Sequence, residues 1–130
     1  MNSERSIHIV EDQQPLNFIL EKVLNPTSNQ QYTLSFSTNA QEAQAKLQNG
    51  SIPHLLILDL HLAGVEHGLD LLKFIRSNEQ VKKLPVIVMT ADADPNLQGA
   101  CERLGVSGYF VKPFDLQQFT HAITEVFQKE

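Results

Sequence analysis

The sequence predicts an α/β fold, a doubly wound (βα)5 three-layer sandwich in which helices cover both faces of a parallel sheet. Two observations support this prediction. Short apolar segments alternate with helical patterns five times along the 130 residues, with no repeat or linker between them, and strict alternation is typical of parallel β–α units. The chain length suits one domain, residues 1–130, with enough residues to bury a core.

Four of the five predicted strands are short and almost continuously apolar, as expected for strands that are covered on both faces. They are Ile7–Val10, Leu55–Asp59, Val86–Thr90 and Gly108–Val111. The second strand, Tyr32–Ser37, alternates apolar with hydroxyl side chains and is predicted to be half buried. That pattern favours an edge position, which the flavodoxin-like strand order 2-1-3-4-5 gives to the second strand.

The first two helices are predicted from apolar residues at helical spacing and from their end signals. Apolar residues within 16–24 follow the 3.6-residue period, and Pro26 stops that helix. Thr38 and Gln41 have the spacing of a capping box, so the second helix is predicted to begin at Thr38. It is predicted to end at Gly50, because glycine commonly follows the last turn of a helix.

The other three helices have equally local signals. The third follows Gly68, and the fourth begins with Asp94 as N-cap and Pro95 in its first turn. The fifth carries its apolar residues within 116–127. Gly99 lies inside the fourth helix and costs about 1 kcal/mol relative to alanine, so we expect this helix to be the loosest.

Composition excludes several classes of protein. Apolar residues make up 42% of the chain, but no stretch is long enough to span a membrane, and the N-terminus lacks the features of a signal peptide. Cys101 is the single cysteine, which fits a reducing, cytoplasmic location. The net charge of −5 argues against direct contact with nucleic acid.

Acidic residues follow two strands that this order makes neighbours. In doubly wound sheets the ligand site lies beyond the carboxyl ends of the strands, where the order reverses, here between the first and third strands. Glu11 and Asp12 follow the first strand, and Asp59 ends the third. Their mutual repulsion would raise at least one pKa unless a cation compensates for it. Oxygen ligands with open positions favour Mg²⁺.

Two more polar residues are predicted at the same edge of the sheet. Thr90 ends the fourth strand and Lys112 follows the fifth. Taken singly, each polar residue at this edge has a structural explanation, as a turn, capping or surface residue. Together, an acidic cluster, a metal, a hydroxyl and an ammonium describe a phosphoryl-transfer site, in which a carboxylate attacks phosphorus.

The residues at these strand ends resemble those of the receiver domain of bacterial two-component response regulators, the CheY-like superfamily. The segments that carry the resemblance are, in order, IHIVED, LLILDLHL, VIVMTA and GYFVKPF. The 22-residue spacing between Thr90 and Lys112 also agrees with the family pattern. The resemblance covers essentially the whole chain and predicts a two-component signalling protein.

The resemblance implies roles for the acidic residues. Asp59 matches the residue that accepts a phosphoryl group from a sensor histidine kinase, a phosphotransfer protein or a small phosphodonor. Glu11, Asp12 and Asp59 match the side chains that bind Mg²⁺, with Mn²⁺ as an alternative, and the backbone carbonyl of His61 matches a further metal ligand. The chain would catalyse only its own phosphorylation and dephosphorylation, and is otherwise not an enzyme.

The resemblance also implies how phosphorylation would change a protein-binding surface. Lys112 matches the lysine that contacts the phosphoryl oxygens, and Thr90 and Tyr109 match the switch residues. The fourth helix, fifth strand and fifth helix would form the face that binds a downstream protein or output domain, and a homodimer through the same elements is an open alternative. Pro113 matches a proline that usually follows a cis peptide bond. No membrane contact is implied.

Two features lie close to the acceptor in sequence. The resemblance implies that His61 and Asp92, two residues beyond the acceptor and the switch hydroxyl, tune the rate of dephosphorylation. The family pattern places a glycine eight residues after the acceptor, whereas Gly68 stands nine residues after Asp59. The loop of residues 60–68 is therefore predicted to be one residue longer than usual.

Two other functions are compatible with parts of this pattern. A metal-dependent phosphatase of the haloacid class needs a second aspartate two residues after the first, where this chain has His61. A phosphorylation-independent interaction module typically loses the acceptor or one of the metal-binding acids, and this chain retains both. The chain ends directly after the fifth helix, so a stand-alone regulator and a piece of a longer protein both stay open. The sequence names neither the kinase nor the target, and it does not predict the lifetime of the phosphorylated form.

Overall fold

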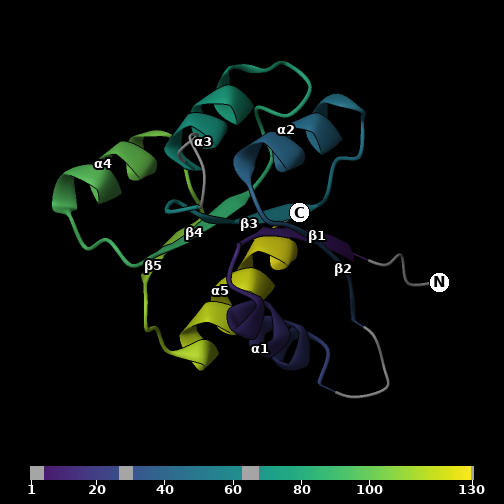
Figure 1. Ribbon diagram of the computed structural model, residues 1–130, viewed down its shortest axis with the longest axis vertical. Coiled ribbons are helices and arrows are strands. Elements are labelled where there is room, and N and C mark those ends of the chain that lie inside the picture. Colours follow the sequence, from purple (N-terminus) through teal and green to yellow (C-terminus); the bar gives the residue numbers. More distant parts are fainter. Residues whose placement is uncertain (1–4, 27–30, 63–67, 130) are drawn as a thin grey trace.

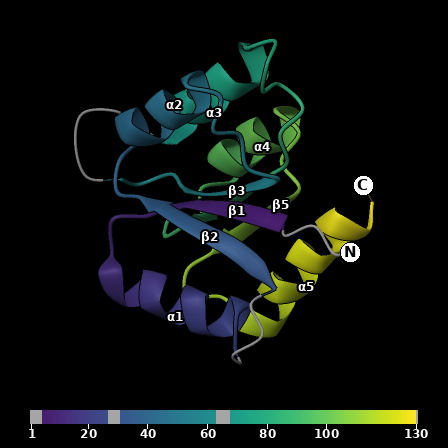
Figure 2. The ribbon, with the colours of Figure 1, turned by 90° about the vertical axis from the view of Figure 1, so that its right-hand side faces the viewer.

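The structure, a computed structural model, describes residues 5–26, 31–62 and 68–129. It contains a five-stranded parallel sheet with the strand order β2-β1-β3-β4-β5. Helices α1 and α5 cover one face of the sheet, and α2, α3 and α4 cover the other (Figures 1 and 2). The predicted three-layer sandwich and its strand order are therefore confirmed. Within these residues no helix is both long and apolar enough to cross a membrane.

The elements alternate along the chain as predicted. The strands are β1 Arg5–Val10, β2 Tyr32–Ser37, β3 Leu55–Asp59, β4 Val86–Thr90 and β5 Gly108–Val111. The helices are α1 Gln14–Leu24, α2 Ala40–Gln48, α3 Gly68–Ser77, α4 Pro95–Arg103 and α5 Leu116–Gln128.

Two predicted boundaries were wrong. β1 begins at Arg5 rather than Ile7, because Arg5 pairs with Tyr32 of β2 and its guanidinium lies 4.8 Å from the ring centre of Phe127. The N-cap of α2 is Asn39 rather than Thr38. The Asn39 side chain accepts a hydrogen bond from Glu42 N at 2.8 Å, so asparagine, and not threonine, provides the cap.

Each face of the sheet has its own hydrophobic core, because successive side chains of a strand point to opposite faces. On the α1/α5 side, Ile9 and Ile57 are fully buried and pack with Phe119. On the other side, Leu56 and Leu58 pack with residues of α2 and α3. Burial of each such side chain contributes about 1.5–3 kcal/mol to folding, which makes β3 a rigid support for the residue at its end.

β5 differs from the prediction of full burial, since all four of its residues are only partly buried. It is the second edge of the sheet, next to β4 alone. Two successive side chains of β5 pack on opposite faces of the sheet. Tyr109 packs on the α2/α3/α4 side, and Phe110 packs on the α1/α5 side. Phe110, Phe114 and Phe119 form an aromatic cluster with ring centres 4.8–5.8 Å apart, and this cluster anchors the start of α5.

The edge strand β2 is connected to β1 by a buried histidine. His8 is 5% exposed, and its Nδ1 and Nε2 atoms lie 2.6 Å from the hydroxyls of Ser35 and Ser37 respectively. Ser37 is fully buried, so the predicted alternation of buried and exposed residues fails at the last position of β2. Burial, assisted by the nearby charge of Lys46, lowers the pKa of His8 to about 4.

This buried histidine predicts a pH dependence of stability. Between pH 6.5 and about 4 the unfolded chain protonates His8 whereas the folded protein does not, so stability falls as the pH falls. We expect the His8 contribution to the free energy of unfolding to decrease by on the order of 3 kcal/mol across this window. His8→Asn keeps hydrogen-bonding groups but does not titrate, and should flatten the dependence in urea unfolding from pH 7.5 to 4.5. Exposed His121, replaced in the same way, serves as the control, and equal pH slopes for wild type and His8→Asn would contradict the prediction.

Candidate functional site

Three carboxylates meet at the carboxyl ends of β1 and β3. The two strands are neighbours in the sheet, with Val10 opposite Leu58, so the residues that follow Val10 lie beside Asp59. Glu11, Asp12 and Asp59 each offer an oxygen, and these oxygens lie within 4.8 Å of one another. Glu11 and Asp59 are buried and Asp12 is partly buried. The structure thus brings together the acidic residues that the strand order predicted at this edge.

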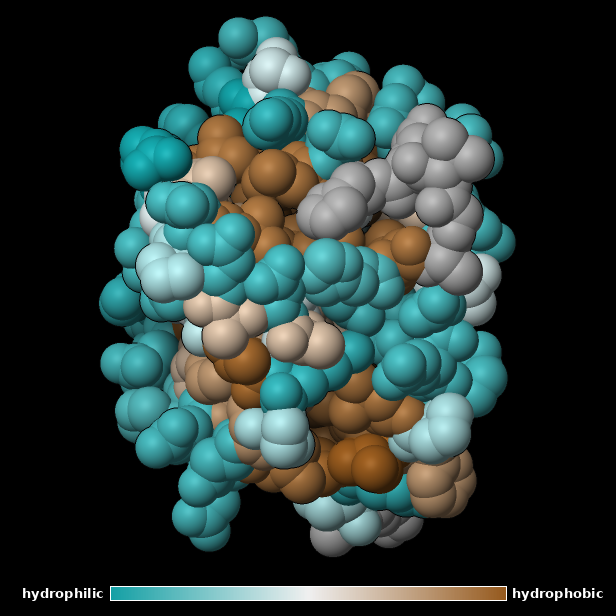
Figure 3. All heavy atoms as spheres, turned by 60° about the vertical axis from the view of Figure 1, so that its left-hand side comes forward, coloured by the Kyte–Doolittle hydropathy of each residue, from teal (hydrophilic) through white to brown (hydrophobic). Residues whose placement is uncertain are grey.

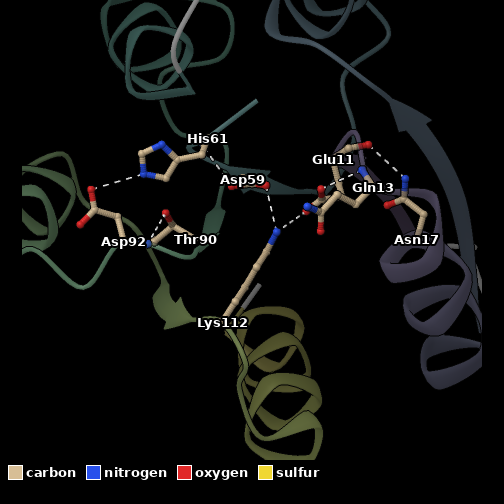
Figure 4. Close-up of polar contacts among 8 residues, drawn as sticks. All are labelled: Glu11, Gln13, Asn17, Asp59, His61, Thr90, Asp92 and Lys112. Atoms are coloured by element: carbon tan, nitrogen blue, oxygen red, sulfur yellow. Dashed lines mark hydrogen bonds and ion pairs between the residues drawn. The ribbon is translucent and has the colours of Figure 1, made fainter. Parts of the chain in front are cut away.

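Lys112 joins two of these acids (Figure 4). Its Nζ donates to Glu11 Oε1 at 2.7 Å and to Asp59 Oδ2 at 2.9 Å. Burial alone would lower the pKa of Lys112, but the hydrogen bonds to both carboxylates outweigh it and raise that pKa above its usual value. The lysine is therefore charged at neutral pH and compensates part of the negative charge of the cluster.

Glu11 is held in place from two sides. Its backbone N donates to Ser37 O at 2.9 Å, its backbone O accepts from Asn17 Nδ2 at 3.0 Å, and its Oε2 accepts from Gln13 N at 2.9 Å. Burial raises the pKa of Glu11 to about 7, although the hydrogen bonds from Lys112 and Gln13 act in the opposite direction. Asn17, a buried residue in the first turns of α1, was not among the predicted site residues, because nothing in the sequence pattern singles it out.

The predicted switch residues are bonded to Asp92 in this structure. Thr90 Oγ1 accepts from Asp92 N at 3.1 Å, and Tyr109 Oη donates to Asp92 O at 3.2 Å. His61 approaches the same residue, with Nε2 donating to Asp92 Oδ2 at 3.3 Å, while His61 N donates to Asp59 Oδ1 at 2.9 Å. Figure 4 shows Asp92 at the left, hydrogen-bonded to both His61 and Thr90, on the side of the site away from Glu11.

Gly68 lies directly against the end of β3. Its N donates to Leu60 O at 3.1 Å. A Cβ atom added at this position would lie 2.5 Å from Asp59 O and 2.7 Å from Leu60 Cα, both of them backbone atoms. Glycine is therefore required here for close packing. Residues 63–67 lie outside the described residues, so the predicted extra residue in the 60–68 loop stays a prediction.

The connection from β5 to α5 completes the site. Lys112 N donates to Thr90 O at 2.7 Å, and the Lys112–Pro113 peptide bond is cis, as the family resemblance implied. Asp115 caps α5 by accepting from Gln117 N at 2.7 Å. The lysine is thus fixed at its backbone by β4 on one side and by a capped helix on the other.

The donor set fits a hard divalent cation. Such ions are bound by carboxylate and carbonyl oxygens, and three carboxylate oxygens lie within reach of one position beside Asp59. The residues present therefore fit Mg²⁺ or Mn²⁺.

Comparison with known proteins agrees with this geometry. Residues 7–124 match the family model described as the response regulator receiver domain. The chemotaxis protein CheY-3 of Vibrio cholerae is 31% identical, over 99% of this chain and 96% of its own length. The chemotaxis protein CheY of Pseudomonas aeruginosa is 30% identical, over 95% of this chain and 96% of its own length.

Solved structures show the same fold. The phosphorylated cyanobacterial phytochrome response regulator RcpA is 25% identical with a TM-score of 0.80, and the match covers 95% of this chain and 91% of that one. The Mn²⁺-bound form of response regulator Rcp1 is 26% identical with a TM-score of 0.77, and the match covers 94% of this chain and 88% of that one.

Proposed function

The chain belongs to the response regulator receiver family, and we propose that Asp59 is the residue that accepts a phosphoryl group within it. The observation that carries this proposal is the bridge from Lys112 to Asp59 and Glu11 beside three clustered carboxylate oxygens. We take the chain to be a single cytoplasmic receiver domain.

The reaction follows from the positions of these groups. One carboxylate oxygen of Asp59 attacks the phosphorus of a phosphohistidine or of acetyl phosphate, and the bond from phosphorus to the donor breaks with its electron pair on the leaving group. Mg²⁺, held by Glu11, Asp12, Asp59 and the His61 carbonyl, would neutralise charge on the phosphoryl oxygens. Lys112 Nζ, already 2.9 Å from Asp59 Oδ2, would bind another phosphoryl oxygen and stabilise the developing charge.

A direct test is incubation with acetyl phosphate and Mg²⁺, followed by intact-protein mass spectrometry. We expect a phosphoryl adduct that does not form when EDTA is present. Beryllofluoride, a stable phosphoryl mimic, serves as a second probe in case the adduct hydrolyses quickly. A folded protein that neither gains mass nor binds beryllofluoride would contradict the proposal.

The output of this site would be a change in a protein-binding face. Phosphorylation adds about two negative charges and strong hydrogen-bond acceptors at Asp59. Thr90 would turn towards them, and Tyr109 would follow, shifting the population of conformations of α4, β5 and α5. We propose that a downstream protein, or a second copy of the chain, binds the altered face.

An apolar groove next to the site suggests where a phosphodonor protein binds. The groove has a volume of about 530 Å³ and begins at Gln13 and Lys112, beside the acidic cluster. Ile19 lines it and is 44% exposed, and neighbouring Phe18 is 61% exposed. Figure 3 shows this hydrophobic surface in the lower half of the molecule, below a band of hydrophilic residues. A donor that fills the groove would bring its phosphohistidine close to Asp59.

Ile19→Ser is expected to slow phosphoryl transfer from a phosphohistidine protein about tenfold, because exposed apolar anchors dominate such interfaces. The rate with acetyl phosphate should be unchanged, since that donor does not use the groove. Ile52→Ser is the matched control, because Ile52 is 43% exposed but lies before the opposite, amino end of β3. The test is the phosphoryl-transfer rate of each variant with both donors. Equal slowing by the two variants would show that the groove is not the binding site of the donor protein.

A further inference from the structure

Asn17, in the first turns of α1, connects that helix to the end of β1. Its Nδ2 donates to Glu11 O at 3.0 Å, and its N donates to Gln13 O at 3.2 Å. We propose that Asn17 is a positioning residue of the metal site, which fixes the peptide unit between Glu11 and Asp12 and thereby sets the direction of the Asp12 carboxylate. The inference rests on the proposed function and adds a residue to its metal site.

The bond from Asn17 holds the peptide unit that links the two acids. A peptide unit is planar, so the Glu11 carbonyl, the Asp12 N–H and the Asp12 Cα atom rotate together. Glu11 N is already held by Ser37 O of β2 at 2.9 Å. With its N bonded to the sheet and its O bonded to Asn17, Glu11 has little freedom of backbone rotation. The direction in which the Asp12 side chain leaves the backbone is restricted as a result.

The start of α1 is attached to Glu11 rather than closed by a cap of its own. Gln13, the residue before the helix, makes no side-chain capping bond. Its N donates instead to Glu11 Oε2 at 2.9 Å. Figure 4 shows the second link, in which the Asn17 amide reaches from α1 to the Glu11 carbonyl. Both links end on the residue that also accepts from Lys112 Nζ, so the geometry of the acidic cluster and the start of α1 depend on each other.

The Asn17 amide is buried with one of its polar atoms unpaired. The residue is 5% exposed, and its Oδ1 has no hydrogen-bond partner among the described residues. Turning the amide over would place Oδ1 against Glu11 O, with two acceptors in contact, so the donated bond determines the orientation. A buried acceptor without a partner lowers stability. A role at the site explains an asparagine that costs stability at this position.

Three substitutions separate the donated hydrogen bond from the packing of α1. Asn17→Leu keeps a branched side chain but cannot donate to Glu11 O. Asn17→Ala cannot donate either, but it leaves room for a water molecule that can. Leu20→Val is the matched control. Leu20 is a fully buried residue of the same helix, and its replacement loosens the packing without removing a hydrogen bond.

The measurement is the dissociation constant for Mg²⁺, obtained from the backbone amide NMR signals of Asp12 and Asp59. We expect it to rise about tenfold in Asn17→Leu, as is usual when a group that orients a metal ligand is lost. Asn17→Ala should raise it about threefold, since a bound water replaces the donor less firmly. Leu20→Val should leave it unchanged. Without Mg²⁺, the melting temperature of Asn17→Leu should stay within about 5 °C of the wild-type value, because this variant removes the unpaired acceptor together with the donor.

A purely structural role for Asn17 gives a different pattern, in which the Asn17 variants lose stability but bind Mg²⁺ as tightly as wild type. That result, or equal weakening by Leu20→Val, would overturn the inference while leaving the proposed function intact. Weakening in Asn17→Leu but not in Asn17→Ala would also overturn it, because leucine would then act by crowding Glu11. A wild-type protein that binds no Mg²⁺ would overturn the proposed function itself, and this inference with it. Circular dichroism of each variant verifies the fold.

Discussion

Replacing Asp59 with asparagine is expected to abolish phosphorylation by acetyl phosphate, with the rate falling at least about a hundredfold. The amide lacks the anionic oxygen that attacks phosphorus, and it also removes one of the three clustered carboxylates. It leaves the buried volume nearly unchanged and can still accept a hydrogen bond from His61 N. Intact-protein mass spectrometry at saturating Mg²⁺ measures the effect.

The matched control is Asp70→Asn, which makes the same chemical change at an exposed position in the first turn of α3. This variant should be phosphorylated at the wild-type rate. Thermal unfolding of both variants checks that each is folded. An adduct that forms at full yield on Asp59→Asn would show that another residue is the acceptor.

Replacing Gly68 with alanine is expected to lower the free energy of unfolding by about 3 kcal/mol or more. The added Cβ would lie 2.5 Å from Asp59 O and 2.7 Å from Leu60 Cα. Neither atom belongs to a flexible side chain, so relief of the clash would displace either the start of α3 or the end of β3. Urea unfolding gives the change in stability, and the phosphorylation rate reports whether Asp59 has moved.

Gly99→Ala provides the comparison. Gly99 lies inside α4, and the nearest atom to an added Cβ is Arg103 Nη1 at 3.4 Å, the end of a long side chain. Alanine should therefore stabilise the protein by about 0.5–1 kcal/mol, the usual gain inside a helix. Opposite signs for the two glycines are expected, and a similar loss at both would show that steric packing at Gly68 is not the reason for its presence.

The sequence predicted the parts of the fold that depend on periodicity and on strand order. Continuous apolar segments located β3 and β4, and the alternation in Tyr32–Ser37 located an edge strand. The proximity of Glu11 and Asp59 could also be predicted, because neighbouring parallel strands end at the same edge of a sheet. The same apolar signal failed for β5, since it does not distinguish a strand with two neighbours from one with a single neighbour.

Side-chain partners were less accessible from the sequence. The spacing of residues did not show that Lys112 would bond to Glu11 as well as Asp59, because that choice depends on the depth of Glu11 below the surface. It also did not indicate that Asn17 would hold the Glu11 carbonyl, or that Asp92 would join Thr90 to Tyr109. The contacts of Lys112 and Tyr109 join segments that are distant in sequence, whereas the contact of Asn17 with Glu11 is local but depends on how α1 packs after β1.

The side chains of Tyr109 and Phe110 lie on opposite faces of the sheet, so the sheet separates the surroundings of one from those of the other. Tyr109 lies with α4 on one side, whereas Phe110 belongs to the aromatic cluster with Phe114 and Phe119 on the other. A rearrangement of the tyrosine need not disturb the three clustered rings, so the start of α5 can keep its aromatic packing while Tyr109 moves. The two adjacent residues thereby separate the side chain that is proposed to rearrange from the aromatic cluster that supports the start of α5.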